Sequence, residues 1–237
     1  MATTHILYNP KRGDCKLAQL QYFLAHIDLI AFKCVKRVDN KLVQVYNPII
    51  FCGDFNCDFR SKFYEFINNG KLTDYKNLNR NLLSGQLEST SSYIPIENNL
   101  LVMGEVLNIS DQCQFKHEVT KRISVNQAEG CEVSLLNHGG NELRHSFDFE
   151  SVYKHHNEEM SLEITTCLKD TKKTVDYIFF HNSENKNMSE HVEEIAQLKL
   201  LGRLELFKMN QIEHVTSLPI KNYPSDHFMI AARFSIT

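Results

Sequence analysis

Polar side chains that could act together chemically stand beside three apolar runs in distant parts of the sequence. Asp54 and Asn56 follow the first run, Asp176 lies inside the second, and the pair Asp226-His227 opens the third. Carboxylates are hard oxygen ligands of the kind that Mg²⁺ and Mn²⁺ prefer. An imidazole titrates near neutral pH and can serve as a general base. Because a buried charge needs a partner, we expect these groups to converge in one site.

The first run predicts a short buried strand with its polar residues at the C-terminal end. Residues 48–52 are mostly apolar, and Gly53 ends the run. In extended backbone Asp54 and Asn56 point to the same side, at the edge where open α/β sheets hold their ligands. Gly, Asp and Asn also form turns, so a simple turn at residues 53–56 is an alternative. Equally, Asp226 could only cap the last element, and His5 could be a satisfied core histidine.

Helices around this strand complete the pattern of a layered α/β domain. Apolar residues at helical spacing predict an amphipathic helix from Cys15 to about Ile30, with Asp14 as its N-cap. Ser61 is placed to cap a second helix, which Gly70 would end. The polar and basic stretch from Cys34 to Tyr46 is predicted to be a surface loop. Further strands are expected at residues 1–8, 198–207 and 229–234.

Residues 87–161 are polar and irregular, and we interpret them as an insertion with one or two short elements. Val133 to Leu136 is a candidate for a short strand there, and a short helix is expected from Ser189. The histidines of this region fit no metal-ligand motif and are expected to be solvated; they are His117, His138, His145, His155 and His156.

Composition is typical of one soluble globular domain, or of part of one. The chain has 237 residues, of which 42% are hydrophobic and 23% charged, and its net charge of −3 gives no overall basic signal for nucleic acid. Seven cysteines without a CxxC pair favour reduced thiols over disulfides or structural zinc. No run approaches the ~18 apolar residues of a membrane span, and no signal peptide is recognisable. We therefore expect a cytosolic or nuclear protein without membrane contact.

Three motifs, in order, resemble those of the endonuclease/exonuclease/phosphatase superfamily. They are Gly53-Asp54-Phe55-Asn56, Val175-Asp176-Tyr177-Ile178 and Ser225-Asp226-His227, and Thr3-Thr4-His5-Ile6-Leu7 resembles the motif that precedes them. Within the superfamily, residues 4–14 and 199–204 are most similar to the Angel proteins, relatives of nocturnin and the carbon catabolite repression deadenylases. The resemblance is closest over residues 1–86 and 145–237.

The resemblance implies a fold and a chemistry. The fold is the C-terminal portion of a four-layer α/β/β/α sandwich of the DNase I type, with residues 1–237 in one domain and the polar insertion at 87–161. The chemistry is hydrolysis of a phosphate ester, assisted by Mg²⁺ or Mn²⁺ on Asp54 and Asp226.

The same resemblance assigns roles to the other residues. His227 is the base or a transition-state donor, and Asp176 would fix the tautomer of its ring. Asn56 would bind a phosphate oxygen or the attacking water. His5 would lie beside the phosphate. Asn9 and Thr166 are the candidate substrate-binding residues, and structural packing is an equal alternative for Thr166.

The implied substrate is the 3′ end of an RNA. Two activities fit: a 3′-to-5′ exonuclease on poly(A), or a phosphatase on terminal 2′,3′-cyclic phosphates. The N-terminal half of the superfamily domain, with a metal-binding glutamate, has no counterpart in this sequence. We therefore expect this chain alone to be poorly active or inactive, and a protein partner is expected to cover the place of the missing half. The alternative is a non-catalytic RNA- or protein-binding remnant.

Overall fold

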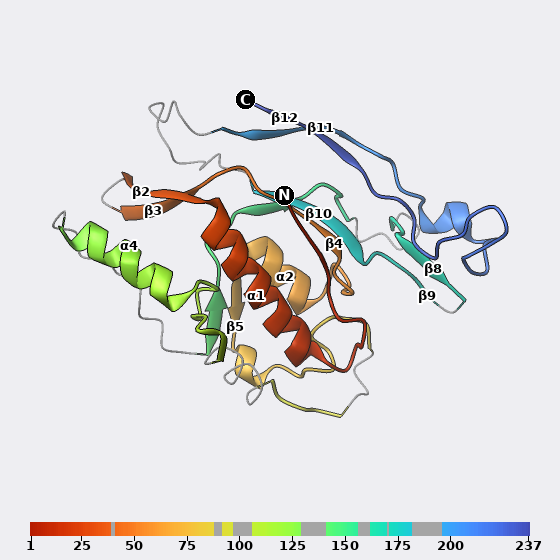
Figure 1. The fold of residues 1–237 in the computed structure, drawn as a ribbon. Helices are drawn as coiled ribbons and strands as arrows, with labels where there is room; N and C mark the ends of the chain where they lie inside the picture. The colour runs from red at the N-terminus through yellow and green to blue at the C-terminus, as the bar shows by residue number, and fades with distance from the viewer. Residues whose placement is uncertain are drawn as a thin grey trace.

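A four-stranded mixed sheet forms the centre of the molecule, in the order β1-β4-β10-β7 (Figure 1). β1 (Ala2–His5) is parallel to β4 (Ile50–Asp54), whereas β10 (Asp176–His181) is antiparallel to both β4 and β7 (Phe149–Ser151). The computed structural model describes residues 1–38, 41–87, 92–96, 106–128, 141–155, 162–169, 171–181 and 196–237.

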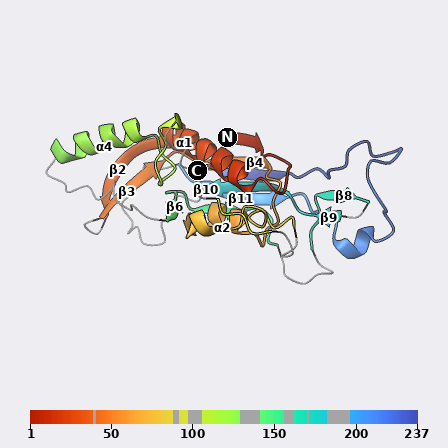
Figure 2. The ribbon, with the colours of Figure 1, turned by 90° about the horizontal axis from the view of Figure 1, so that it is seen from below.

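Two helices cover one face of this sheet. They are α1 (Gly13–Ala31) and α2 (Lys62–Asn69), which lie on the near side of the sheet in the view of Figure 2. Their apolar side chains form one core with Phe51 of β4 and with Tyr177 and Phe179 of β10. Burial of this apolar face holds the strands and helices together.

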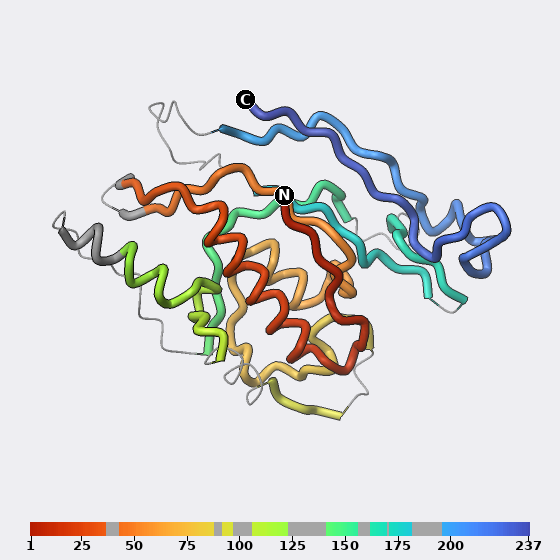
Figure 3. The backbone as a smooth tube through the Cα atoms, viewed as in Figure 1, coloured from red at the N-terminus to blue at the C-terminus, as the bar shows by residue number. Residues whose placement is uncertain are grey.

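The opposite face of the sheet packs against β11 (Leu198–Arg203) and β12 (Ala232–Ile236), an antiparallel pair. The rings of Phe180 and Phe234 meet here with their centroids 5.3 Å apart. Since side chains alternate along a strand, β10 divides its apolar residues between the two cores. The chain thus begins in the central sheet and ends in the outer strand pair (Figure 3). The mixed α/β class is confirmed, and a fourth layer stays a prediction.

The second helix and its boundaries agree with the sequence. The Ser61 hydroxyl accepts a hydrogen bond from the Tyr64 amide at 3.1 Å, as an N-cap does. Gly70 ends the helix in the left-handed conformation with φ 69°. Phe63, Phe66 and Ile67 are buried on the face turned to the sheet. These signals were sufficient to predict the helix because they lie close together in the sequence.

Two local predictions were wrong. The expected loop from Cys34 to Tyr46 is a hairpin of β2 (Phe32–Val38) and β3 (Lys41–Tyr46), because its β-branched valines favour strands despite the intervening charges. Asp14 is not the N-cap of α1. The helix begins earlier, with Arg12 as its N-cap, and buried Asp14 accepts hydrogen bonds from the Arg12 guanidinium in the first turn.

The predicted insertion at residues 87–161 contains parts of the core. β6 (Glu142–Arg144) pairs with β5 (Lys71–Thr73), and β7 joins the central sheet. Leu143 and Phe149 are buried there, so tertiary packing overrides the polar local composition. His145 is also buried, contrary to the expectation of a solvated ring. The domain limits themselves stay a prediction, and Val133 to Leu136 and the segment from Ser189 lie outside the described residues.

Shorter elements complete the described structure. They are α4 (Lys116–Ala128), the β8–β9 hairpin (Thr166–Leu168 with Thr171–Lys173), and the 3₁₀ turns η1 (Tyr75–Asn77) and η3 (Met209–Ile212). The last two strands differ from the predicted ranges by a few residues at their ends. None of the described helices combines the length and apolarity needed to cross a bilayer.

Candidate active site

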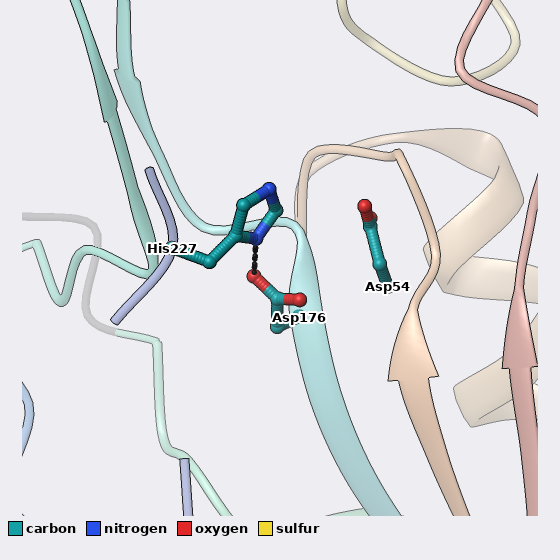
Figure 4. A group of neighbouring side chains, drawn as sticks. All are labelled: Asp54, Asp176 and His227. Carbon is teal, nitrogen blue, oxygen red and sulfur yellow. Dashed lines mark hydrogen bonds and ion pairs between the residues drawn. The ribbon is translucent and has the colours of Figure 1, made fainter. Parts of the chain in front are cut away.

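The register of the central sheet brings two carboxylates together. Asp54 at the end of β4 is the direct partner of Asp176 at the start of β10. Directly opposed residues of an antiparallel pair lie on the same face, so both side chains point to the same side of the sheet. The C-terminal segment adds His227, whose position is fixed by a bridge to Thr166 at the start of β8. Ligand atoms of Asp54, Asp176 and His227 all lie within 4.8 Å of one another (Figure 4).

His227 and Asp176 form a hydrogen-bonded pair. The His227 Nδ1 lies 2.8 Å from Asp176 Oδ2. This hydrogen bond and the charge of Asp176 raise the pKa of His227 to about 8, against the effect of burial. The carboxylate thus favours a proton on Nδ1 and leaves Nε2 turned away from Asp176 (Figure 4).

Asp54 is held by Asn56. The Asn56 backbone amide donates to Asp54 Oδ1 at 2.8 Å, and the Asn56 side-chain nitrogen donates to Oδ2 at 3.1 Å. That nitrogen also donates to the Ile6 carbonyl at 2.9 Å, so both of its protons are used within the protein. Burial raises the pKa of Asp54, and the neighbouring charge of Asp176 raises it further. Asn56 therefore orients a carboxylate whose charged form is costly without a cation.

His5 approaches the same carboxylate from the neighbouring strand. Its partner in the register is Asp54, and the His5 Nε2 lies 3.3 Å from Asp54 Oδ2. The imidazole is largely exposed, which excludes the alternative of a core histidine. Gly53 permits this close pairing: its φ is 142°, and a Cβ at this position would clash with the Thr4 carbonyl oxygen.

A cavity of about 520 Å³ opens over these residues. Six predicted site residues line it: His5, Asp54, Asn56, Thr166, Asp226 and His227. Asp176 contacts His227 at its edge. Asn9 is not among the lining residues, and its side-chain oxygen accepts a hydrogen bond from the Lys11 amide at 3.0 Å within the loop after β1. The structure thus brings together all but one of the predicted site residues, while their roles stay predictions.

The donor set fits a divalent cation. Asp54 and Asp176 offer hard carboxylate oxygens, and their mutual repulsion is part of what raises the pKa of Asp54. A cation bound at Asp54 would offset that repulsion. Asp226 lines the same cavity but is not in the group of ligand atoms within 4.8 Å. Its main-chain oxygen instead anchors the segment, accepting hydrogen bonds from the Cys167 amide and the Thr166 hydroxyl.

Among the residues at the site that reasoning from the sequence did not find, three carry side-chain amide or ammonium groups. Lys173 and Gln86 line the cavity, and Lys16 of α1 lies beneath it with no exposed surface. Lys173 and Gln86 stand in polar stretches without a motif, so no local signal marks them. Lys16 does have one: at helical spacing it occupies the same stripe as Leu20 and Ile27, a place where a lysine is unusual.

Comparison with known proteins gives relatives along the whole chain, although no protein-family model matches it. Protein angel homolog 2 from Bos taurus is 33% identical over 249 residues, covering 100% of this chain and 44% of the relative. Protein angel homolog 1 from Rattus norvegicus is 29% identical over 287 residues, covering 100% of this chain and 42% of the relative. The chain thus spans less than half the length of either.

A solved structure has the same fold. It is ANGEL2, described as a 2′,3′-cyclic phosphatase, in complex with adenosine-2′,3′-vanadate, and it is similar with a TM-score of 0.70 and 32% identity. The match covers 98% of this chain and 55% of that one. Because the sequence similarity and the shared fold both extend over nearly all of its residues, this chain belongs with the Angel-type proteins of the endonuclease/exonuclease/phosphatase superfamily.

Proposed function

We propose that this chain forms the catalytic part of a phosphoesterase that opens terminal 2′,3′-cyclic phosphates at RNA 3′ ends. The observation that supports this most directly is the cluster of Asp54, Asp176 and His227, with ligand atoms within 4.8 Å of one another under a cavity. A fold shared with a 2′,3′-cyclic phosphatase that was solved with an adenosine 2′,3′-vanadate adds to the support.

The reaction asks little of the protein beyond positioning and proton transfer. Water adds to phosphorus and gives up a proton, one ring P–O bond breaks, and the released ribose oxygen takes up a proton, so the step needs no further reactant. With a pKa of about 8, His227 holds a proton at neutral pH and can donate it to a phosphate oxygen from Nε2. Asp176 keeps that ring in place, and Asn56 keeps the Asp54 carboxylate turned to the cavity.

We propose Mg²⁺ or Mn²⁺ as the cofactor, held by Asp54 and Asp226. The hard oxygens at the cavity and the raised pKa of Asp54 support this choice. When bound, the cation would neutralise charge that develops on the phosphate oxygens. A divalent cation should raise the melting temperature of the wild type and have no effect on Asp54→Asn. An equal rise in both proteins would contradict binding at Asp54.

Product analysis on a panel of RNA 3′ ends tests the activity. The panel contains one oligoribonucleotide in three forms, which end in a 2′,3′-cyclic phosphate, a 3′-phosphate or a poly(A) tail with a 3′-hydroxyl. Each form is incubated with Mg²⁺ or with EDTA. We expect slow loss of the cyclic phosphate, abolished by Asp54→Ala but not by Glu205→Ala, an exposed carboxylate away from the cavity. Shortening of the poly(A) tail nucleotide by nucleotide would instead support an exonuclease. RNA binding without turnover would support the non-catalytic alternative.

The outer strand pair is the surface on which we place the predicted protein partner. Leu201 of β11 and Ile236 of β12 are 53% and 70% exposed. These side chains offer exposed apolar area that a partner would bury. This partner stays a prediction. Charged replacements at both positions should abolish the gain in activity that such a partner gives, while leaving the activity of the chain alone unchanged.

A further inference from the structure

A fully buried lysine lies beneath the proposed active site. Lys16 of α1 has 0% exposed surface. Its Nζ donates at 2.6 Å to the Asn56 carbonyl and at 2.6 Å to the Gln86 side-chain oxygen. A buried ammonium is costly unless it is hydrogen-bonded. Its two strong contacts both lead to residues that line the cavity, so the ammonium couples α1 to the floor of the site.

The contact to Asn56 supports an unusual backbone conformation. Asn56 has a φ of 47°, in the left-handed region, and its side chain and amide both hold Asp54. In this conformation the Asn56 carbonyl points into the protein, where Lys16 supplies its donor. Loss of that donor would leave a buried carbonyl unsatisfied and free the backbone to leave this conformation.

The contact to Gln86 fixes the direction of a carboxamide. An ammonium only donates, so Gln86 must turn its oxygen to Lys16, and the Ser84 hydroxyl donates to the same oxygen at 3.2 Å. The Gln86 side-chain nitrogen is thereby turned away from Lys16. Among the residues that the structure describes, it has no acceptor. Because Gln86 lines the cavity, this nitrogen is the part of the side chain available to a ligand there.

The surroundings of Gln86 suit an anion. The Lys173 ammonium lies 3.5 Å from the Gln86 carbonyl and lines the same cavity. His227 stands on the cavity wall as a further donor. Asp54 lines the same cavity and carries a carboxylate, so a phosphate bound there also needs N–H donors and cations around it.

We propose that Gln86 is a substrate-binding residue whose side-chain nitrogen donates to an oxygen of the terminal phosphate, and that Lys16 is the positioning residue that orients Gln86 and Asn56 together. The substrate named here rests on the proposed function. Lys16 itself does not touch the substrate. It acts by fixing the orientation of Gln86, which donates to the substrate, and of Asn56, which holds the Asp54 carboxylate.

The first test is direct binding, with adenosine 2′,3′-cyclic phosphate as the probe. In ¹⁵N-labelled wild-type protein, the probe should shift the side-chain amide signals of Gln86, which are assigned by their loss in Gln86→Leu. Gln86→Leu should weaken binding about tenfold, as expected for loss of a hydrogen bond to a charged group. Gln211→Leu, an exposed glutamine away from the cavity, is the matched control and should bind like the wild type.

The second test concerns Lys16 and does not depend on activity. Lys16→Met should speed hydrogen exchange of the Asn56 amide at least about tenfold, while the Tyr64 amide, bonded to Ser61, keeps its wild-type rate. A merely structural role would change both amides alike. If Lys16→Met does not fold, Lys16→Gln keeps a shorter donor and serves in its place. In the binding assay, adding Lys16→Met to the Gln86→Leu variant should weaken affinity by a smaller factor than adding Lys16→Met to the wild type.

The outcomes separate this inference from the proposed function. A shift of the Gln86 amide without hydrolysis would contradict the function and support the binding role. Hydrolysis with unchanged affinity in Gln86→Leu would overturn the binding role and leave the function standing. No shift of Gln86 at millimolar probe would overturn the binding role as well. Equal exchange at Asn56 in the wild type and Lys16→Met would overturn the positioning role.

Discussion

At the scale of single residues, the pair of His227 and Asp176 is the best-defined contact of the site. Asp176 is the largest cause of the raised pKa of His227, through a hydrogen bond of 2.8 Å. The folded pKa lies above the ordinary value of about 6.5. The contact therefore contributes stability that is complete below that value and is lost as the pH rises past about 8.

Asp176→Asn should lower the pKa of His227 from about 8 toward its ordinary value, because the imidazolium loses its charged acceptor. An NMR titration of the His227 ring in EDTA measures this. Asp226→Asn is the matched control: it removes a charge that acts on His227 without a hydrogen bond, so its effect should be smaller. A His227 pKa that stays near 8 in Asp176→Asn would contradict the assignment.

Residue types allowed part of this site to be predicted. A carboxylate inside an apolar strand needs a partner, and so does a histidine that directly precedes another apolar strand. These residue types therefore indicated Asp176 and His227 from the sequence alone. Lys16 and Gln86 were missed since their importance lies in contacts between segments distant in sequence. Asn56 was found, and its side-chain nitrogen donates to Asp54 and to the Ile6 carbonyl. Its role toward a phosphate or the attacking water stays a prediction.

At the scale of elements, the contact between β1 and β4 depends on Gly53. Gly53→Ala should lower the free energy of unfolding by more than ~1 kcal/mol, because its φ of 142° is strained for other residues and Thr4 leaves no space for a Cβ. Urea unfolding measures the difference. Gly202→Ala in β11 is the matched control, since a Cβ there meets nothing within 4 Å. Equal losses of unfolding free energy in the two variants would show that the close approach of Thr4 to Gly53 does not determine stability here.

The elements that were predicted correctly have strong local signals. α2 has a capping serine, an apolar face and a terminal glycine within ten or so residues, and β4 has a continuous apolar run. The hairpin of β2 and β3 was missed because lysines and an arginine among its valines hide the strand pattern. β7 was missed because it is short and its stability comes from pairing with β10, which no local pattern reveals.

At the scale of the whole molecule, stability in mild acid depends on a buried histidine. His145 Nε2 lies 3.0 Å from the Phe66 carbonyl, and Nδ1 accepts a hydrogen bond from the Phe147 amide at 3.2 Å. These two contacts select the neutral ring with its proton on Nε2. Burial lowers the pKa of His145 to about 4. Between that value and about 6.5 the unfolded chain binds a proton that the folded chain excludes.

The free energy of unfolding should therefore fall as the pH drops from 7 to 5, with up to ~3 kcal/mol arising from His145 over its full range. Urea unfolding at several pH values measures this slope. His145→Gln should be less stable at pH 7 but should show a shallower slope. Some slope will remain, because burial also lowers the pKa of His181. An unchanged slope in the variant would contradict the role of His145.

The pairing of Asp54 with Asp176 has a consequence for how this site can be altered. The hydrogen-bond ladder between β4 and β10, rather than side-chain freedom, sets the spacing of the two carboxylates. Deleting one residue within either strand would shift the ladder by one position and send one carboxylate into the apolar layer beneath the sheet. Substitutions can therefore tune this chemistry gradually, whereas a single-residue deletion would end it at once, even in a chain that still folds.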